Sequence, residues 1–270
     1  MFLSRHNECN SLEAHITFSL RKENMKATLR HILNLKKEYS RLPFFDFLRD
    51  ETLSARQRLE FYPCMAPFIM SFGDLNRYVM RQEPTSDPYQ AMVNEHSYED
   101  DHHWPWYLED FIKLGFDHEK ISPTEYSQFF YSDHTAVNRL LSHKLAHLIY
   151  SSSSIVRLAI IEAIEETGNV LFELIGKLAV QIEEEMGIEL RYCGEFHFSK
   201  ESGHAMTCDH AIMAKIEMDE ETRAEAIEKV NLVFAWFTEW TEELLAYAKQ
   251  SLNHPYEPLM RHFKREITLV

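Results

Sequence analysis

Glycine is scarce in this sequence. Only seven of the 270 residues are glycine, which is less than half of the ~7% found in average proteins. The seven lie too far apart to form a G-x-G-x-x-G loop or a G-x-x-x-x-G-K-S/T loop. The sequence therefore excludes the glycine-rich loops that hold dinucleotides and nucleotide phosphates.

Positive charge is also in short supply. Lysine and arginine number 28 against 43 acidic residues, giving a formal net charge of −15. The basic residues form no cluster that could bind a phosphate backbone or an anionic membrane surface. No run of 18 apolar residues is present, and the first residues lack the apolar core of a secretory signal. We therefore expect neither nucleic acid nor membrane as a partner.

Cysteines are few and scattered. The four are Cys9, Cys64, Cys193 and Cys208, and no two form a C-x-x-C pair. Such spacing predicts no disulfide framework and no cysteine metal site. A cytoplasmic location is the expectation, since reducing compartments keep thiols reduced.

Proline is absent between Pro123 and Pro255, and strand-like alternation is missing there too. Because proline interrupts helices, this long interval favours helices throughout. Helix starts are predicted by an N-cap with proline at Asp87-Pro88, and by the capping box Ser122 to Glu125. Gly115 and Gly187 mark helix ends. The predicted helices cover residues 11–39, 53–81, 88–114, 123–150, 155–186, 191–217 and 221–250.

These segments predict one all-α domain over residues 1–270, a bundle of about seven helices. The bundle proper spans roughly residues 53–250. The helix at 11–39 and a proline-containing tail at 253–270 are its appendages. No stretch has the composition of a linker between domains.

Histidines and acids concentrate in two clusters that interrupt the apolar pattern, at residues 95–103 and 195–210. In the second cluster, His197, Glu201 and His204 are spaced by four and three residues, which places them on one helix face. Imidazole and carboxylate suit iron, zinc or manganese. An exposed polar face with paired charges is the alternative. It is disfavoured because the neighbouring residues are mostly apolar or small, for instance Phe196 and Phe198.

The first cluster offers two helical registers, and a helix can direct only one of them inward. They are His96, Asp100 and His103, or Glu95, Glu99 and His102. The face that contains His103 continues into the core residues Tyr107 and Phe111, whereas the other continues into charged residues. We therefore predict that His96, His103 and either Glu99 or Asp100 point inward, although Pro105 can change the phase.

A single acid interrupts a third apolar stripe. Leu158, Ile161, Glu165, Gly168 and Phe172 share one face of the helix at 155–186. A buried carboxylate needs a cation or a hydrogen-bond partner. When this helix is considered alone, it is equally possible that Glu165 lies at the edge of the apolar stripe and that its carboxylate reaches water. Glu162 lies at the border of the same stripe. Together the three helices offer about six nitrogen and oxygen ligands, the number that two iron or manganese ions need.

The last cluster carries the most specific motif. Residues 190–204, with His197-x3-Glu201-x2-His204, resemble the final metal helix of the haem-oxygenase-like di-iron oxidases, which has His-x3-Asp/Glu-x2-His. Glu165 lies 32 residues before His197, where this family has its single middle glutamate. Glu201 departs from the more usual aspartate, a conservative change.

The first cluster is similar to the first metal helix of the same family. There a carboxylate precedes a histidine, as Glu99 precedes His103, and the helix ends in Leu-Gly, as at Leu114-Gly115. The sequence departs from the pattern at His96, since a glutamate is common in this part of the helix before the histidine ligand. The resemblance covers roughly residues 55–250.

The resemblance implies a haem-oxygenase-like bundle that binds two Fe(II) ions per chain, or manganese in their place. It implies an enzyme that uses dioxygen to oxidise a small organic molecule. Dimers are common among such bundles, so a homodimer is one outcome that stays open. The ligands implied are His197, Glu201 and His204 on one ion and Glu99, His103 and His96 on the other, with Glu165 shared.

Two other interpretations explain part of the pattern. Glu99-x2-His102 and Glu201-x2-His204 are E-x-x-H motifs, as in ferritin-like di-iron bundles. That scheme needs Glu60 as a further ligand and leaves His197 without a role. The second is a metal-free bundle that binds a small ligand or a protein partner.

Overall fold

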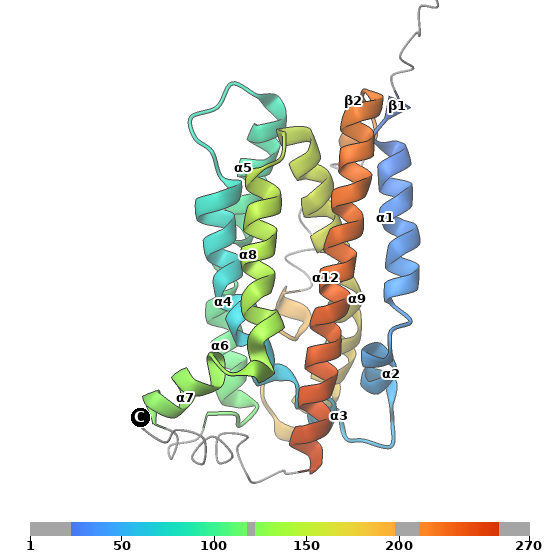
Figure 1. Cartoon of the computed structure of the whole chain (residues 1–270). Helices are drawn as coiled ribbons and strands as arrows, with labels where there is room; N and C mark the ends of the chain where they lie inside the picture. The colour runs from blue at the N-terminus through green and yellow to red at the C-terminus, as the bar shows by residue number, and fades with distance from the viewer. Residues whose placement is uncertain (1–22, 118–121, 198–210, 254–270) are drawn as a thin grey trace, which may run out of the picture.

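The computed structural model describes residues 23–117, 122–197 and 211–253, which are mostly helical. Helices α1 (Lys26–Tyr39), α4 (Ala66–Leu75), α8 (Ala136–Tyr150) and α12 (Glu220–Asn253) lie roughly along one direction (Figure 1). Together with α9 (Ser154–Met186) they form the body of the bundle. The all-α class predicted from the sequence is therefore confirmed.

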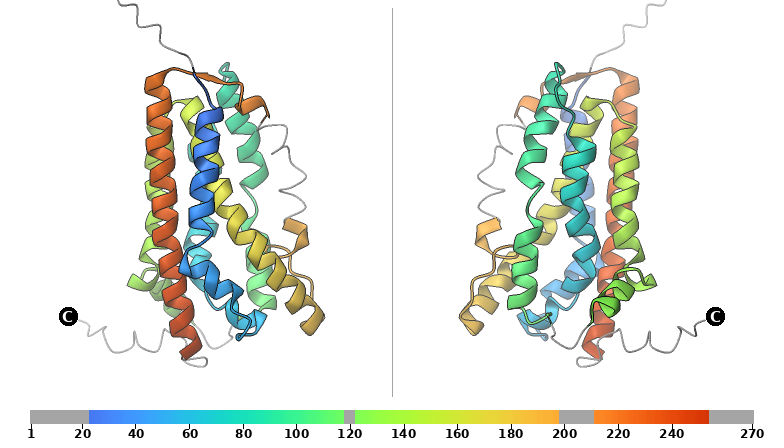
Figure 2. Two further views of the ribbon diagram at one scale, coloured as in Figure 1. Left: turned by 90° about the vertical axis from the view of Figure 1, so that its right-hand side faces the viewer. Right: turned by 90° about the vertical axis from the view of Figure 1, so that its left-hand side faces the viewer.

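Helix α9 is the element around which the site is organised. It packs against α1, α12 and α5 (Pro88–Asp100), and it crosses the bundle obliquely (Figure 2). Most of its residues from Val156 to Ile182 that face these neighbours are buried and apolar. Such a helix, apolar on several sides, is typical of the centre of a bundle.

The two long helices agree with the sequence prediction because their end signals are strong. The Ser153 side chain caps α9, and Gly187, with φ of 67°, ends it in the left-handed conformation. Helix α12 starts one residue before the predicted range, where the Asp219 side chain accepts a hydrogen bond from the Thr222 amide at 2.8 Å.

The helix predicted at 88–114 is in fact two helices. α5 ends at Asp100 and α6 (Trp104–Lys113) begins after a turn. The reason is Pro105, which has no amide hydrogen to donate to the carbonyl of Asp101 and whose ring would clash with it. The two helices follow one another along one side of the bundle (Figure 1). Helix α6 ends before Gly115, which has a φ of 76°, as predicted.

Two further predicted helices are also broken into short pieces. In the range 53–81, Pro63 and Pro67 each start a new turn of helix. In the range 123–150, the hydroxyl of Thr135 bonds to the carbonyls of Phe129 and Phe130 and so competes with the helix. The pieces are α3 (Ala55–Arg58), η1 (Tyr62–Met65), the π turn η2 (Asn76–Met80), α7 (Pro123–Phe130) and η3 (Asp133–Thr135), besides α4 and α8.

The ends of the bundle differ from the prediction. Strand β1 (Glu23–Asn24) pairs antiparallel with β2 (Glu217–Met218), where the sequence predicts helix. Helix α2 (Pro43–Arg49) was not predicted. Residues 11–22, residues 198–210 of the helix predicted at 191–217 and the tail after 253 lie outside the described residues. Among the helices described, none has the length and apolar character needed to cross a bilayer.

Candidate metal centre

Helices α5 and α9 are tied together at their first turns. The Asp87 side chain caps α5 by accepting from the Tyr89 amide at 2.9 Å, and its second oxygen accepts from the Ser154 hydroxyl of α9 at 2.6 Å. At the other end of α5, the Arg81 guanidinium donates to the Ser97 carbonyl at 2.8 Å and to the Asp101 carboxylate at 2.7 Å. The first turn of α5 is therefore held to α9, and its last turn is held by Arg81.

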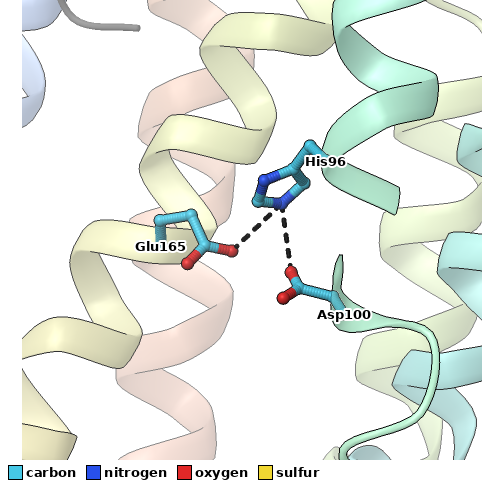
Figure 3. Close-up of side chains that lie close together, drawn as sticks. All are labelled: His96, Asp100 and Glu165. Atoms are coloured by element: carbon cyan, nitrogen blue, oxygen red, sulfur yellow. Dashed lines mark ion pairs between the residues drawn. The ribbon is translucent and has the colours of Figure 1, made fainter. Parts of the chain in front are cut away.

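His96 and Asp100 of α5 face Glu165 of α9 (Figure 3). Nε2 of His96 lies 3.1 Å from Oδ2 of Asp100 and 3.4 Å from Oε1 of Glu165. One ligand atom from each of the three residues lies within 4.8 Å of the other two. Ligands about 2.1 Å from one ion are at most ~4.2 Å apart, so both distances from His96 are compatible with a shared ion.

The contact between His96 and Asp100 is close but is not a good hydrogen bond. Nε2 of His96 and Oδ2 of Asp100 are both buried, and neither atom has a hydrogen-bond partner of acceptable geometry among the described residues. A buried polar atom in this state costs free energy unless something else binds it. The two atoms therefore have coordination capacity that the surrounding protein does not use.

The charges in this cluster compensate one another. Burial lowers the pKa of the His96 imidazole, but the carboxylates of Asp100 and Glu165 raise it more, so that it lies well above its ordinary value. Burial raises the pKa of the Asp100 carboxyl, but the imidazoles of His96, His103 and His197 lower it more, and the net shift is downward. The acids thus favour positive charge at this point.

A second histidine pair lies on the other side of Asp100. Nδ1 of His103 is 3.8 Å from Oδ1 of Asp100 and 3.1 Å from Nε2 of His197. The Asp100 carboxylate thus has one oxygen toward His96 and the other toward His103. Since a carboxylate can bind two metal ions with its two oxygens, Asp100 could contribute to sites on both sides of its carboxylate.

The orientation of His197 is fixed by a turn that α6 holds. Nδ1 of His197 lies 3.0 Å from the Tyr192 carbonyl, and because a carbonyl only accepts, Nδ1 carries the proton. The Asp110 carboxylate of α6 accepts from the amides of Arg191, Tyr192 and Cys193 at 2.7, 2.8 and 2.9 Å. Holding a histidine by Nδ1 is the usual way to present Nε2 to a metal.

Aromatic rings hold both histidines of this pair. The His103 ring stacks on Trp106 with centroids 4.7 Å apart, and the His197 ring stacks on Tyr192 at 4.8 Å. Phe172 of α9 meets the edge of His197 at 4.5 Å. These contacts restrict the rotation of both imidazoles.

Four of the candidate ligands line one cavity of about 70 Å³. They are Asp100, His103, Glu165 and His197. Most of the other residues around the cavity are apolar, from α4, α9 and α12. The cluster therefore has room beside it for a small molecule.

The structure brings together some of the residues selected from the sequence. His96, His103, Glu165 and His197 lie in one region with Asp100. Glu99 is half-buried on α5 and is not part of the His96–Asp100–Glu165 group. Glu201 and His204 lie outside the described residues, so their positions stay a prediction.

The alternative residues lie elsewhere. The His102 side chain is 58% exposed and contacts Asp101, and Glu95 is also exposed, so their register does not face inward. Glu162 is buried but is not in the group with His96. Glu60, which the ferritin-like scheme needs, bonds to Arg56 at 2.9 Å and to the Ser251 hydroxyl at 2.7 Å.

Sequence reasoning missed one residue that shapes the site. Asp110 was read as a poor continuation of the helix face, yet it is fully buried and holds the turn at 191–193. No local spacing could have found it, since its partners are 81 to 83 residues away. Asp100 was the better choice than Glu99, because it lies four residues after His96 and so shares its helix face.

Comparison with known proteins identifies the fold. No protein-family model matches the sequence, and no curated protein matches it either. Among solved structures, a domain of unknown function with a haem-oxygenase-like fold from Shewanella denitrificans is similar. The TM-score is 0.61 at 12% identity, over 88% of this chain and 97% of that domain. The chain thus has the haem-oxygenase-like fold expected from the sequence.

The residues of the His96–Asp100–Glu165 group fit a transition-metal ion. An imidazole and two carboxylates are a set that suits iron, manganese or zinc. The unsatisfied atoms of His96 and Asp100 and the placement of Asp100 between two histidine groups are the observations that support this fit.

Proposed function

We propose that this protein is a non-haem di-iron enzyme that uses dioxygen to oxidise a small organic molecule. His96, Asp100 and Glu165 would hold one ion, and Asp100, His103 and His197 the other. Manganese could replace iron at one or both positions, since the donor set suits both metals. The observation that carries the proposal is the position of the Asp100 carboxylate, 3.1 Å from His96 and 3.8 Å from His103.

The fold and the sequence motifs support the same proposal. The haem-oxygenase-like bundle is the one that the resemblance to di-iron oxidases implies. Glu201 and His204 complete the motif begun by His197 and would add ligands to the second ion. Two ferrous ions would supply the electrons for reducing dioxygen, a chemistry that side chains alone cannot provide.

The protein's own residues would then have defined tasks. Asp110 and the Tyr192 carbonyl orient His197, and Trp106 restrains His103. The aromatic side chains that line the cavity, among them Phe68, Phe172 and Trp240, would limit the access of water to the reacting molecule. Cytoplasmic location and a homodimer remain expectations from the sequence.

The test is reconstitution with ferrous iron under anaerobic conditions, followed by metal analysis. We expect about two ions per chain. Asp100→Asn keeps the shape of the side chain but removes its charge. We expect iron affinity to fall at least tenfold, because removing a residue that only hydrogen-bonds to a metal ligand already costs about that much. Oxygen uptake by the loaded wild type should exceed that of the same amount of iron in buffer.

The control is Glu95→Gln, which removes a carboxylate from the exposed face of the same helix. Its iron content should equal that of the wild type. A wild-type content near zero that Asp100→Asn leaves unchanged would contradict the proposal.

An iron content near zero in the wild type would favour the second candidate function, a metal-free bundle that binds a small ligand. One observation supports it specifically: the raised pKa of His96 allows its imidazolium to compensate Asp100 and Glu165 without a metal. The cavity would then bind a small ligand and perform no redox chemistry.

A further inference from the structure

Gly168 lies in the middle of α9, three residues after Glu165, and lines the cavity beside it. Glycine in a helix interior destabilises the helix relative to alanine, because it loses more backbone freedom on folding. A glycine at such a position therefore calls for a local reason.

Close packing against the described residues does not explain Gly168. Of these residues, a Cβ atom built there meets only the ring of Phe172, at 3.8 Å, which is ordinary contact. The glycines at 73 and 194 differ, since a Cβ atom would lie 2.9 Å from the Asp101 carbonyl oxygen and 2.1 Å from that of Leu190. At 168 the missing side chain leaves space, and that space belongs to the cavity.

Part of the cavity lining is an aromatic wall. Phe68 packs against Phe237 and Trp240 with centroid distances of 5.5 and 5.6 Å, and Phe172 lies on the α9 side. The indole nitrogen of Trp240 donates to Asn138 at 2.6 Å, so its one donor is already used. No lysine or arginine is among the described residues that line the cavity.

We infer that this cavity binds a short hydrocarbon group of the molecule on which the protein acts, and that Gly168 sets the size of that group. The inference rests on the proposed function for the reaction, but the binding site itself does not need a metal. The cavity has about 70 Å³, roughly half the ~150 Å³ of an apolar cavity that binds benzene. A chain of a few carbons therefore matches its volume better than an aromatic ring does.

Charge and shape both support this ligand class. A negatively charged group placed against the aromatic side chains would lose its hydration, and the described lining residues include no lysine or arginine that could compensate it. The polar end of the cavity, with Asp100, Glu165 and His197, would face the atom to be oxidised. The substrate would thus present an uncharged alkyl group to Gly168.

The test uses xenon, which enters small apolar cavities. Xenon binding to the full-length, metal-free protein is measured by the xenon NMR shift, and cyclopropane, a three-carbon hydrocarbon, is added as competitor. We expect the wild type to bind xenon and cyclopropane to displace it.

Two substitutions fill the space to different extents. Gly168→Ala adds one methyl group to the space beside the helix, and its volume is near the ~30 Å³ of one water. We expect it to weaken xenon binding about tenfold, and Gly168→Val to abolish it. The alanine variant should also melt about 2 °C higher, since it removes a glycine from a helix, which shows that it folds.

Gly176→Ala is the matched control, because Gly176 lies on the same helix, is equally free of close contacts and does not line the cavity. It should gain the same thermal stability and keep wild-type xenon affinity. No xenon binding by the wild type, or unchanged binding by both Gly168 variants, would overturn the inference.

Iron content of the same variants separates this inference from the proposed function. Retained iron with lost xenon binding in the Gly168 variants supports both. Absence of iron in the wild type, with the xenon pattern as expected, rejects the di-iron proposal and supports the cavity assignment. Iron bound by a wild type that takes up no xenon rejects the cavity assignment alone.

Discussion

Asp100 is 7% exposed, and its two carboxylate oxygens face different histidines. Such a placement would be unfavourable for an acid without partners, because burial opposes its charge. Here three imidazoles surround it and lower its pKa. At the scale of single residues, Asp100 therefore connects the group on α5 and α9 with His103 and His197.

Asp110 does not contact this group directly but holds the turn at residues 191–193 that orients His197. We predict that Asp110→Asn destabilises the protein by about 2 kcal/mol, because an amide nitrogen would then face an amide N–H of residues 191–193. The measurement is the free energy of unfolding by urea. Iron affinity should fall by roughly ten- to a hundredfold, since His197 loses its fixed orientation.

The neighbouring Glu109→Gln is the control for that change. Its side chain is 41% exposed and pairs with Arg191 at the surface, so we expect a loss below about 0.5 kcal/mol. Equal stability of the two variants would show that Asp110 does not hold the turn.

At the scale of elements, the break between α5 and α6 changes which residues face the site. A continuous helix would keep the phase of α5 through His103, whereas Pro105 starts a new helix there. Asp100 then occupies the last turn of α5 and His103 precedes the first turn of α6. The ambiguity between Glu99 and Asp100 follows from this interruption.

Helix α8 depends on a cap supplied by α12. The Glu243 carboxylate accepts from the amides of Val137 and Asn138 at 2.8 and 2.9 Å. We predict that Glu243→Gln lowers the free energy of unfolding by about 1–2 kcal/mol, because the helix loses a charged cap at its positive end. Thermal or urea unfolding measures this.

Glu242→Gln, one residue earlier on the exposed face of α12, serves as the comparison. It should change stability by less than about 0.5 kcal/mol. A loss in Glu242→Gln as large as that in Glu243→Gln would mean that general charge, not the cap, stabilises α8.

The sequence predicted those elements whose signals are local. Ser153 and Gly187 delimit α9, and Ser122 with Glu125 forms the capping box at the start of α7. The helices with internal proline were predicted too long, because periodicity continues across a break that Pro63, Pro67 or Pro105 imposes. The β1–β2 pair joins segments almost 200 residues apart and leaves no local pattern.

The site was predictable in part for the same reason. Helical spacing identified His96, His103, Glu165 and His197, which the structure places in one region. Asp110 and the aromatic wall act through contacts between distant segments, and these follow from the fold. That His96, His103, Glu165 and His197 bind metal stays a prediction, and so do the positions and roles of Glu201 and His204.

At the scale of the whole molecule, the fold gathers residues from α5, α6, α9 and the turn before His197 around one cavity. A haem-oxygenase-like bundle achieves this because α9 crosses it next to α5 (Figure 2). The central claim is that this interior point binds two metal ions.

Anomalous scattering at the iron edge, from crystals of the protein loaded with ferrous iron, tests that claim most directly. We predict two peaks in the interior, both in contact with Asp100, one nearer His96 and Glu165 and the other nearer His103 and His197. Peaks confined to the surface, or no iron signal beside Asp100, would contradict it.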